Sequence, residues 1–200
     1  NLESLLYHVF KFSLELLGRF LILRSWIPFI ILLIIWSTMF NRALRLPLHG
    51  WQWFTMLSAL IYTLAIAYLC FTPTQYNWGG PHKIFYHVLG VPCNVIPFQA
   101  LSPDFFLNIV MTVPAGIYWY LLSARHDLKS VLLFGILLGI SIETTQFLCD
   151  LFFHVERFVD IDDVITNAAG VLAGFYVMVL LKATALADWI AQLSIKFVKL

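Results

Sequence analysis

The residues best suited to chemistry lie between Ser141 and Gly174, where polar side chains interrupt two long apolar runs. Six of the eleven carboxylates in the chain fall in this stretch. Its polar and charged side chains are Glu143, Gln146, Asp150, Glu156, Arg157, Asp160, Asp162, Asp163 and Asn167. Ionisable groups next to membrane-like sequence are costly, and they persist where they are paired or functional. The stretch is therefore the first candidate for a site.

A functional hypothesis treats these side chains as ligands. Glu143, Asp160 and Asp163 offer the hard oxygen atoms that Mg²⁺ or Ca²⁺ prefers, and Arg157 could bind a phosphate oxygen. The same groups could instead hold a cationic or amide-rich ligand without any reaction. No cofactor is expected except a divalent cation under the first of these hypotheses.

A structural hypothesis uses the same side chains. Asp160 would cap the helix that follows it, with Asp163 completing a capping box. Arg157 would pair with Glu143, Asp160 or Asp163, because a buried carboxylate without such a partner stays protonated. Polar amides on neighbouring helices would hydrogen-bond to one another; these are Asn108, Gln146 and Asn167. Capping does not explain Glu143, which lies inside a helix.

The composition predicts an all-α polytopic integral membrane protein. Hydrophobic residues make up 61% of the 200 and charged residues 12%, against about 25% charged residues in soluble domains. A helix that crosses a bilayer needs about 20 apolar residues. Five segments meet this requirement, at residues 20–40, 51–71, 105–123, 131–153 and 163–181. Since there is no basic stripe, the sequence argues against nucleic acid as a partner.

The segments divide the chain into three parts. Residues 1–50 would hold an interfacial helix and an extra N-terminal span, and residues 51–182 a four-helix membrane domain. Residues 183–200 would form an amphipathic helix on the membrane surface, because apolar and polar side chains alternate at helical spacing. The connection at 72–104 is rich in aromatic residues, proline and glycine, so we expect an irregular segment in the headgroup layer.

Basic residues predict the orientation in a plasma or inner membrane. Arg42, Arg45, Arg125 and Lys129 fall in connections on one face of the five-span topology. By the positive-inside rule that face is cytoplasmic. The connection at 72–104 and the acidic stretch would then share the extracytoplasmic side.

The last predicted span carries a stripe of residues at intervals of three and four: Asp160, Asp163, Asn167, Gly170 and Gly174. Its upper part is acidic and its lower part is small, so another helix can approach the glycines closely. Pro114 and Gly116 of the third span are further expected helix-packing positions.

Three cysteines, Cys70, Cys93 and Cys149, fall near the predicted outer ends of the spans. One disulfide is geometrically feasible, although the odd count and the apolar neighbours favour buried thiols.

Three blocks of residues carry a resemblance to a known family. Asn94-Val95-Ile96-Pro97-Phe98 looks like an N-[LI]-x-P-F element. The segment from Asn108 to Gly116 looks like N-x-x-x-F-x-P-x-G, with Thr112 where an aromatic residue is usual. The third block, E-x-x-Q followed by R-x-x-D-x-x-D-x-x-x-N-x-x-G, matches Glu143, Gln146, Arg157, Asp160, Asp163, Asn167 and Gly170. In this order the blocks resemble the VanZ-like membrane proteins, whose founding member is linked to teicoplanin resistance.

The placement of the polar residues on the spans predicts a polar pocket between the third, fourth and fifth spans, near the outer surface. Its candidate lining residues are Asn94, Asn108, Glu143, Gln146, Arg157, Asp160, Asp163 and Asn167. One hypothesis is a protein that binds or modifies a lipid-linked wall precursor and confers tolerance of glycopeptide-type antibiotics. A second is a metal-assisted intramembrane enzyme acting on a lipid phosphate, with Glu143 as base. A third is a non-catalytic subunit of a larger membrane complex. Whether any reaction is catalysed stays open.

Overall fold

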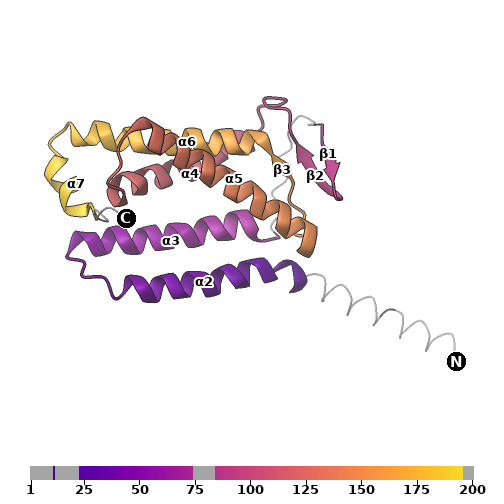
Figure 1. Ribbon diagram of the computed structural model, residues 1–200, viewed down its shortest axis with the longest axis horizontal. Helices are drawn as coiled ribbons and strands as arrows, with labels where there is room; N and C mark the ends of the chain where they lie inside the picture. Colours follow the sequence, from indigo (N-terminus) through magenta and orange to yellow (C-terminus); the bar gives the residue numbers. More distant parts are fainter. Residues whose placement is uncertain (1–10, 12–22, 74–83, 196–200) are drawn as a thin grey trace.

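Long apolar helices make up most of the computed structural model, which describes residue 11, residues 23–73 and residues 84–195. In that part of the chain five helices are long and apolar enough to cross a bilayer. They are α2 (Ile27–Ala43), α3 (Trp51–Phe71), α4 (Pro103–Leu122), α5 (Leu128–Phe153) and α6 (Ile161–Lys182). In Figure 1 they run along one common direction, as in a membrane-spanning bundle. The prediction of an all-α polytopic membrane protein is confirmed.

Local sequence signals explain where these helices begin. The carboxylate of Asp127 accepts a hydrogen bond from the backbone N–H of Ser130 at 2.9 Å and caps α5. The helix therefore begins at Leu128, three residues before its predicted start at residue 131. Hydrogen bonds from Ser130 hold the pKa of Asp127 below its ordinary value. Helix α4 opens on Pro103, because the first turn of a helix does not need the N–H that proline lacks.

The first span differs more from the prediction of residues 20–40. A helical turn at 23–25 is followed by a break at Trp26, and α2 then runs to Ala43. Pro28 lies in the first turn of α2, where its fixed φ angle suits a helix start.

Helix α6 is the most buried of the five spans and packs against both α4 and α5. A Cβ atom placed on Gly170 or Gly174 would overlap the backbone carbonyl of Ile109 or Val113 in α4. On α4, a Cβ atom at Gly116 would overlap the backbone of α6. Small residues at such positions let two helix backbones approach closely in a membrane.

Helix α5 approaches α6 in the same way on another face. A Cβ atom on Gly139 would lie 2.9 Å from the Cα atom of Val164, and one on Gly135 would lie 3.0 Å from that of Ala168. Helices α4, α5 and α6 therefore form a trio in close backbone contact, and α6 lies in its centre.

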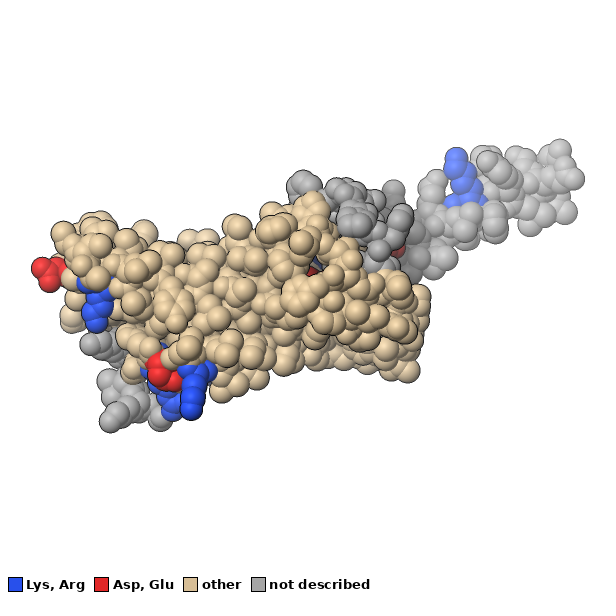
Figure 2. All heavy atoms as spheres, turned by 90° about the horizontal axis from the view of Figure 1, so that it is seen from above, with Lys and Arg blue, Asp and Glu red and all other residues tan. Residues whose placement is uncertain are grey.

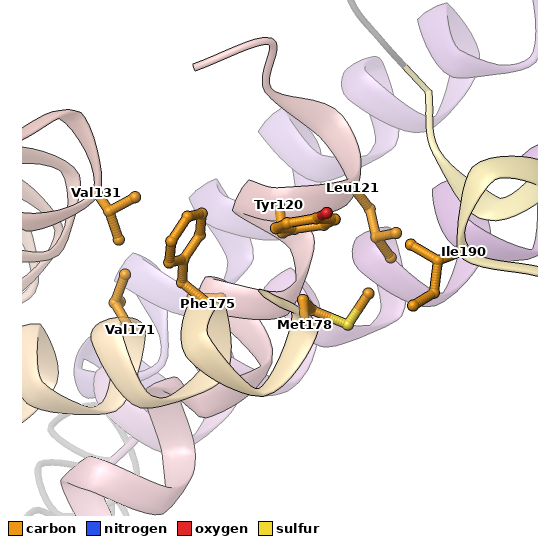
Figure 3. Close-up of a cluster of buried hydrophobic side chains, with 8 residues drawn as sticks. Tyr120, Leu121, Val131, Val171, Phe175, Met178 and Ile190 are labelled. Atoms are coloured by element: carbon orange, nitrogen blue, oxygen red, sulfur yellow. The ribbon is translucent and has the colours of Figure 1, made fainter. Parts of the chain in front are cut away.

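An apolar cluster fills the end of the bundle away from the acidic stretch. Val131 of α5 and Val171 of α6 are fully buried and point toward each other in Figure 3. The other members are Ala115, Tyr120, Leu121, Phe175, Met178 and Ile190. They join α4, α5 and α6 to the C-terminal segment.

The C-terminal segment returns to the bundle after a short helix, α7 (Ala187–Leu193). The hydroxyl of Thr55 in α3 donates to the carbonyl of Leu193 at 2.8 Å, and the N–H of Ile195 donates to the carbonyl of Leu121 at 2.8 Å. Ile190 is buried, whereas Trp189 is exposed. The helix expected over residues 183–200 thus ends at Leu193, because the chain there turns inward to bond with α3 and α4.

A small sheet at the opposite end is a feature that the sequence did not predict. Strand β1 (Tyr86–Val88) pairs antiparallel with β2 (Val91–Asn94), and β2 pairs parallel with β3 (Val159–Asp160). The connection expected to be irregular is therefore partly extended. It meets the chain that precedes α6 at the same end of the bundle (Figure 1).

Two expectations lie outside the described residues. The interfacial helix predicted at 2–18 falls there, and so does the stretch 74–83 of the aromatic connection.

The contact between α4 and α6 generates a prediction. Gly174→Ala forces a methyl group against the carbonyl of Val113, so it should destabilise the protein by about 1–3 kcal/mol, the usual cost of overpacking. Thermal unfolding in detergent measures this cost. The control is Ala173→Val at an exposed position on the same helix, which should leave the unfolding temperature nearly unchanged. Equal effects of the two substitutions would contradict the close contact.

Candidate functional site

Asp160 stands at the centre of the polar cluster and is buried. One oxygen atom, Oδ1, accepts the backbone N–H of Asp162 at 2.9 Å, so Asp160 is the N-cap of α6. The same oxygen accepts a hydrogen bond from Nδ2 of Asn94 at 2.8 Å. One carboxylate thus starts α6 and holds strand β2, and the negative charge suits the positive end of the helix dipole.

Glu143 contacts the same residue from α5. Its Oε2 atom accepts the backbone N–H of Asp160 at 2.8 Å, and the side chain is buried. A capping box needs a carboxylate that accepts this N–H, and the sequence assigned that role to Asp163. The structure gives it to Glu143, a side chain from the preceding helix. Capping within a single helix did not explain Glu143. This contact between two helices gives it a structural role.

Asn94 and Asp162 shape the loop between β2 and α4. Oδ1 of Asn94 accepts the N–H of Ile96 at 3.0 Å and Nε2 of Gln99 at 2.6 Å. Oδ1 of Asp162 accepts the N–H of Phe98 at 2.8 Å. The Asn-x-x-Pro-Phe block is therefore tied to the start of α6 by side-chain hydrogen bonds at both ends.

Gln146 and Arg157 bind the C-terminal end of α3. Nη2 of Arg157 donates to the carbonyls of Leu69 at 2.9 Å and Thr72 at 3.1 Å. Nε2 of Gln146 donates to the carbonyl of Cys70 at 3.2 Å. The last carbonyls of a helix lack partners within it, and a cation there also suits the negative end of its dipole. Arg157 acts here as a capping group.

The remaining predicted residues lie deeper in the bundle or at its edge. Asn167 is 1% exposed, and its side-chain amide makes no hydrogen bond among the described residues. The hydroxyl of Thr112 donates to the backbone carbonyls of Asn108 at 2.8 Å and Asn167 at 3.0 Å. Asp163 is half-buried in the first turn of α6. Thr112 therefore connects the two asparagine positions through their backbones.

The expected metal ligands Glu143, Asp160 and Asp163 do not gather into a coordination site. In residues 23–73 and 84–195, no group of three His, Cys, Asp or Glu side chains is arranged to hold a metal ion. Oε2 of Glu143 and Oδ1 of Asp160 instead face N–H donors. One oxygen atom of each of these two carboxylates is therefore engaged with the backbone at the start of α6.

The three cysteines are buried and free. Cys93 lies in β2, where its thiol donates to the carbonyl of Val91 at 3.6 Å. Burial raises the pKa of the Cys93 thiol, so it remains protonated at neutral pH. No disulfide joins these residues.

An open apolar hollow lies beside the cluster, on the outer face of α4. Its volume is about 490 Å³. Leu101, Pro103, Phe106, Leu107 and Val110 line it. The hollow begins at the end of the loop that Asp162 and Asn94 hold.

Comparison with known families identifies the fold. A family profile described as VanZ/LLP1 matches residues 54–182, well over half of the chain. The chain belongs to the VanZ/LLP1 family. Searches of curated proteins and of solved structures return no match. The match confirms the resemblance stated from the sequence blocks.

The VanZ-like region runs from α3 to the end of α6 and contains the whole polar cluster. The second sequence block of the resemblance joins α4 to α6 through the hydroxyl of Thr112. The first and third blocks meet in this region and supply side chains that bond α3, α5, β2 and α6 to one another. We call this set of contacts the junction; its residues are Asn94, Gln99, Glu143, Gln146, Arg157, Asp160 and Asp162.

Two members of the junction, Gln99 and Asp162, were not assigned a role from the sequence. Nε2 of Gln99 donates to Asn94, and its Oε1 accepts the N–H of Ile84 at 2.9 Å. Asp162 is completely buried although its neighbour Asp163 is not. In the sequence, Gln99 is simply a polar residue after Pro97 and Phe98, and this is a weak signal of a role in the site. The alternation of burial within the Asp-Ile-Asp-Asp run becomes visible only once the helix start is known.

The cap at Asp160 generates a prediction. Asp160→Ala removes both the cap and the acceptor for Asn94, so it should destabilise the VanZ-like region by at least the usual capping cost of about 1–2 kcal/mol. Asp160→Asn keeps an oxygen at the cap and should lose much less, because Asn and Asp are equally good N-caps. Thermal unfolding of the two variants side by side tests this. If they lose stability equally, the charge and not the cap is what α6 requires.

Proposed function

We propose that this VanZ-like membrane protein binds a lipid-linked component of the cell envelope, such as a wall precursor, and thereby confers tolerance of glycopeptide-type antibiotics. The observation that carries the proposal is the apolar hollow on α4, which is lined in part by Leu101 at the end of the loop that Asp162 holds. A hydrocarbon chain could lie in the hollow while its polar head stays at the end of the bundle. The family to which the chain belongs supports the link to antibiotic tolerance.

The position of the hollow argues for a ligand that enters from the membrane. Leu107 and Val110 belong to a span and are exposed on its outer face, where the surrounding solvent is lipid. Phe98 of the loop lies 6.3 Å from Phe105 of α4, ring centre to ring centre. Leu101 at the end of the same loop lines the hollow. The hydrogen bond from Phe98 to Asp162 fixes the loop and favours a preformed site.

The junction supports binding over chemistry. Its amide and carboxylate oxygens accept hydrogen bonds from the backbone and from neighbouring side chains. Such a network fixes the shape of the end of the bundle. The alternative of a metal-assisted enzyme acting on a lipid phosphate has less support, because no group of three His, Cys, Asp or Glu side chains in residues 23–73 and 84–195 is arranged to hold a metal ion.

A specific observation also favours a second candidate, a non-catalytic subunit of a larger membrane complex. Helix α2 is the least buried of the five spans and lies outside the matched region. A second membrane protein could cover that face. In this case the protein should migrate with a partner of defined size after gentle solubilisation from its native membrane.

The orientation follows from the charges. Exposed basic side chains lie at the end of the bundle that carries the connections α2–α3, α4–α5 and α6–α7. They are Arg42, Arg45, Arg125, Lys129 and Lys182. Figure 2 shows several blue side chains at that end, with red ones beside them, and a further blue group at the opposite end of the view. We assign this end to the cytoplasm. The junction then faces the extracytoplasmic side.

Cysteine labelling tests the orientation. Glu156→Cys, at an exposed position of the junction end, should react with a membrane-impermeant thiol reagent in intact cells. Arg45→Cys, at the basic end, should react only after the membrane is opened. The native chain gives the background, which should be low because its three cysteines are buried. Reaction of Arg45→Cys alone in intact cells would reverse the orientation.

A bulky substitution tests the ligand site. Leu107→Trp should fill the hollow and lower both antibiotic tolerance and crosslinking to a photoreactive polyprenyl phosphate in membranes. Leu133→Trp is the matched control, because residue 133 is an exposed leucine on α5 outside the hollow. Thermal unfolding of both variants is measured as well, to establish that each of them is folded. Unchanged crosslinking and tolerance in a folded Leu107→Trp variant would refute the proposed site.

A further inference from the structure

The segment from residue 84 to residue 102 carries no acidic or strongly basic side chain and exposes many large apolar side chains. It contains no Lys, Arg, Asp or Glu, although it lies outside the spans. Its large exposed side chains are Ile84, Tyr86, Val88, Leu89, Val95, Ile96, Phe98 and Leu101. Extended exposed apolar surface on a folded protein marks a contact with a partner or a membrane.

Leu89 is the clearest case. It forms the two-residue turn between β1 and β2 together with Gly90, and both residues have positive φ angles, of 53° and 91°. Turns with two positive φ angles favour Asn-Gly or Asp-Gly. A leucine there accepts an unfavourable backbone conformation, and its side chain is 77% exposed. In water both features are unfavourable, whereas in hydrocarbon the exposed side chain becomes stabilising.

Phe98 repeats this combination in the loop before α4. Its φ angle is 59° and its side chain is 59% exposed. The N–H of Phe98 donates to the buried carboxylate of Asp162 at 2.8 Å, so the junction holds the backbone in this conformation. The outward position of the ring is therefore built into the fold.

The surface around Phe98 is continuous with the lipid-facing surface of the bundle. Leu101 lines the same hollow as Phe106 and Val110, which are exposed side chains of a span. Phe98 and Phe105 connect the loop to that helix. In Figure 1 the loop stands at the end of the bundle, next to the starts of α4 and α6. A lipid leaflet would cover both the exposed face of α4 and the exposed loop around Phe98 without a break.

We infer that residues 84–102 form a membrane-interface anchor, in which Leu89 and Phe98 insert into the apolar part of the leaflet at the junction end. The absence of charge fits this position, because charged side chains at membrane depth are costly. The inference goes beyond the aromatic composition of the connection, since it names two inserted side chains and the carboxylate that sets one of them. It does not rest on the proposed ligand.

Spin labelling in lipid vesicles tests the anchor. A nitroxide is attached at Leu89→Cys, Phe98→Cys or Leu101→Cys, one at a time, in the full chain. Collision rates with oxygen, which concentrates in hydrocarbon, are compared with collision rates for a water-soluble nickel chelate. Phe106→Cys on the lipid face and Lys129→Cys in the basic end provide the lipid and water references. The unsubstituted chain gives the background from the buried cysteines.

The expected result is an oxygen-to-nickel ratio several-fold above the Lys129 reference at residues 89 and 98, approaching that of Phe106. A ratio equal to the water reference at both residues would overturn the inference. Low collision rates with both reagents would also overturn it, because a second protein or a second copy of the chain would then cover the segment. If Phe98→Cys does not fold, Leu101→Cys, which is exposed in the same loop, replaces it as the second reporter.

Discussion

The hydrogen bond from the backbone N–H of Asp160 to Glu143 is the contact on which the architecture of this end depends. It fixes Asp160, the N-cap residue of α6, against α5, and α6 in turn lies at the centre of the helix trio. Inside a membrane each buried N–H or carbonyl without a partner costs several kcal/mol. A glutamate from a neighbouring helix satisfies an N–H that α6 alone leaves without an acceptor.

The same requirement explains the other polar residues of the junction. Helix α3 ends with carbonyls that need hydrogen-bond donors. Arg157 and Gln146, which are far from α3 in the sequence, supply these donors. Strand β2 needs an anchor near the membrane surface, and Asn94 receives one from Asp160. Glu143 and Asp160, which the sequence offered as ligands for a metal, thus complete the start of α6.

Sequence reasoning predicted what depends on local pattern. The bounds of α3 follow from hydropathy, because Trp51 and Phe71 are the ends of one apolar run. The spacing of Gly170 and Gly174 predicted a close helix contact because a helix places both on one face. The sequence could not predict that Glu143, and not Asp163, accepts the N–H of Asp160, since the two residues that share this hydrogen bond are 17 positions apart. Strand β3 has only two residues, too few for any periodic signal.

The return of the C-terminal segment has a consequence for how freely the helices can move at the basic end. The carbonyl of Leu193 accepts a hydrogen bond from Thr55 of α3, and the N–H of Ile195 donates to Leu121 of α4. One short stretch of chain after α6 thus connects α3 to α4. A displacement of α3 away from α4 at this end would have to break one of these two hydrogen bonds or pull the stretch along with it.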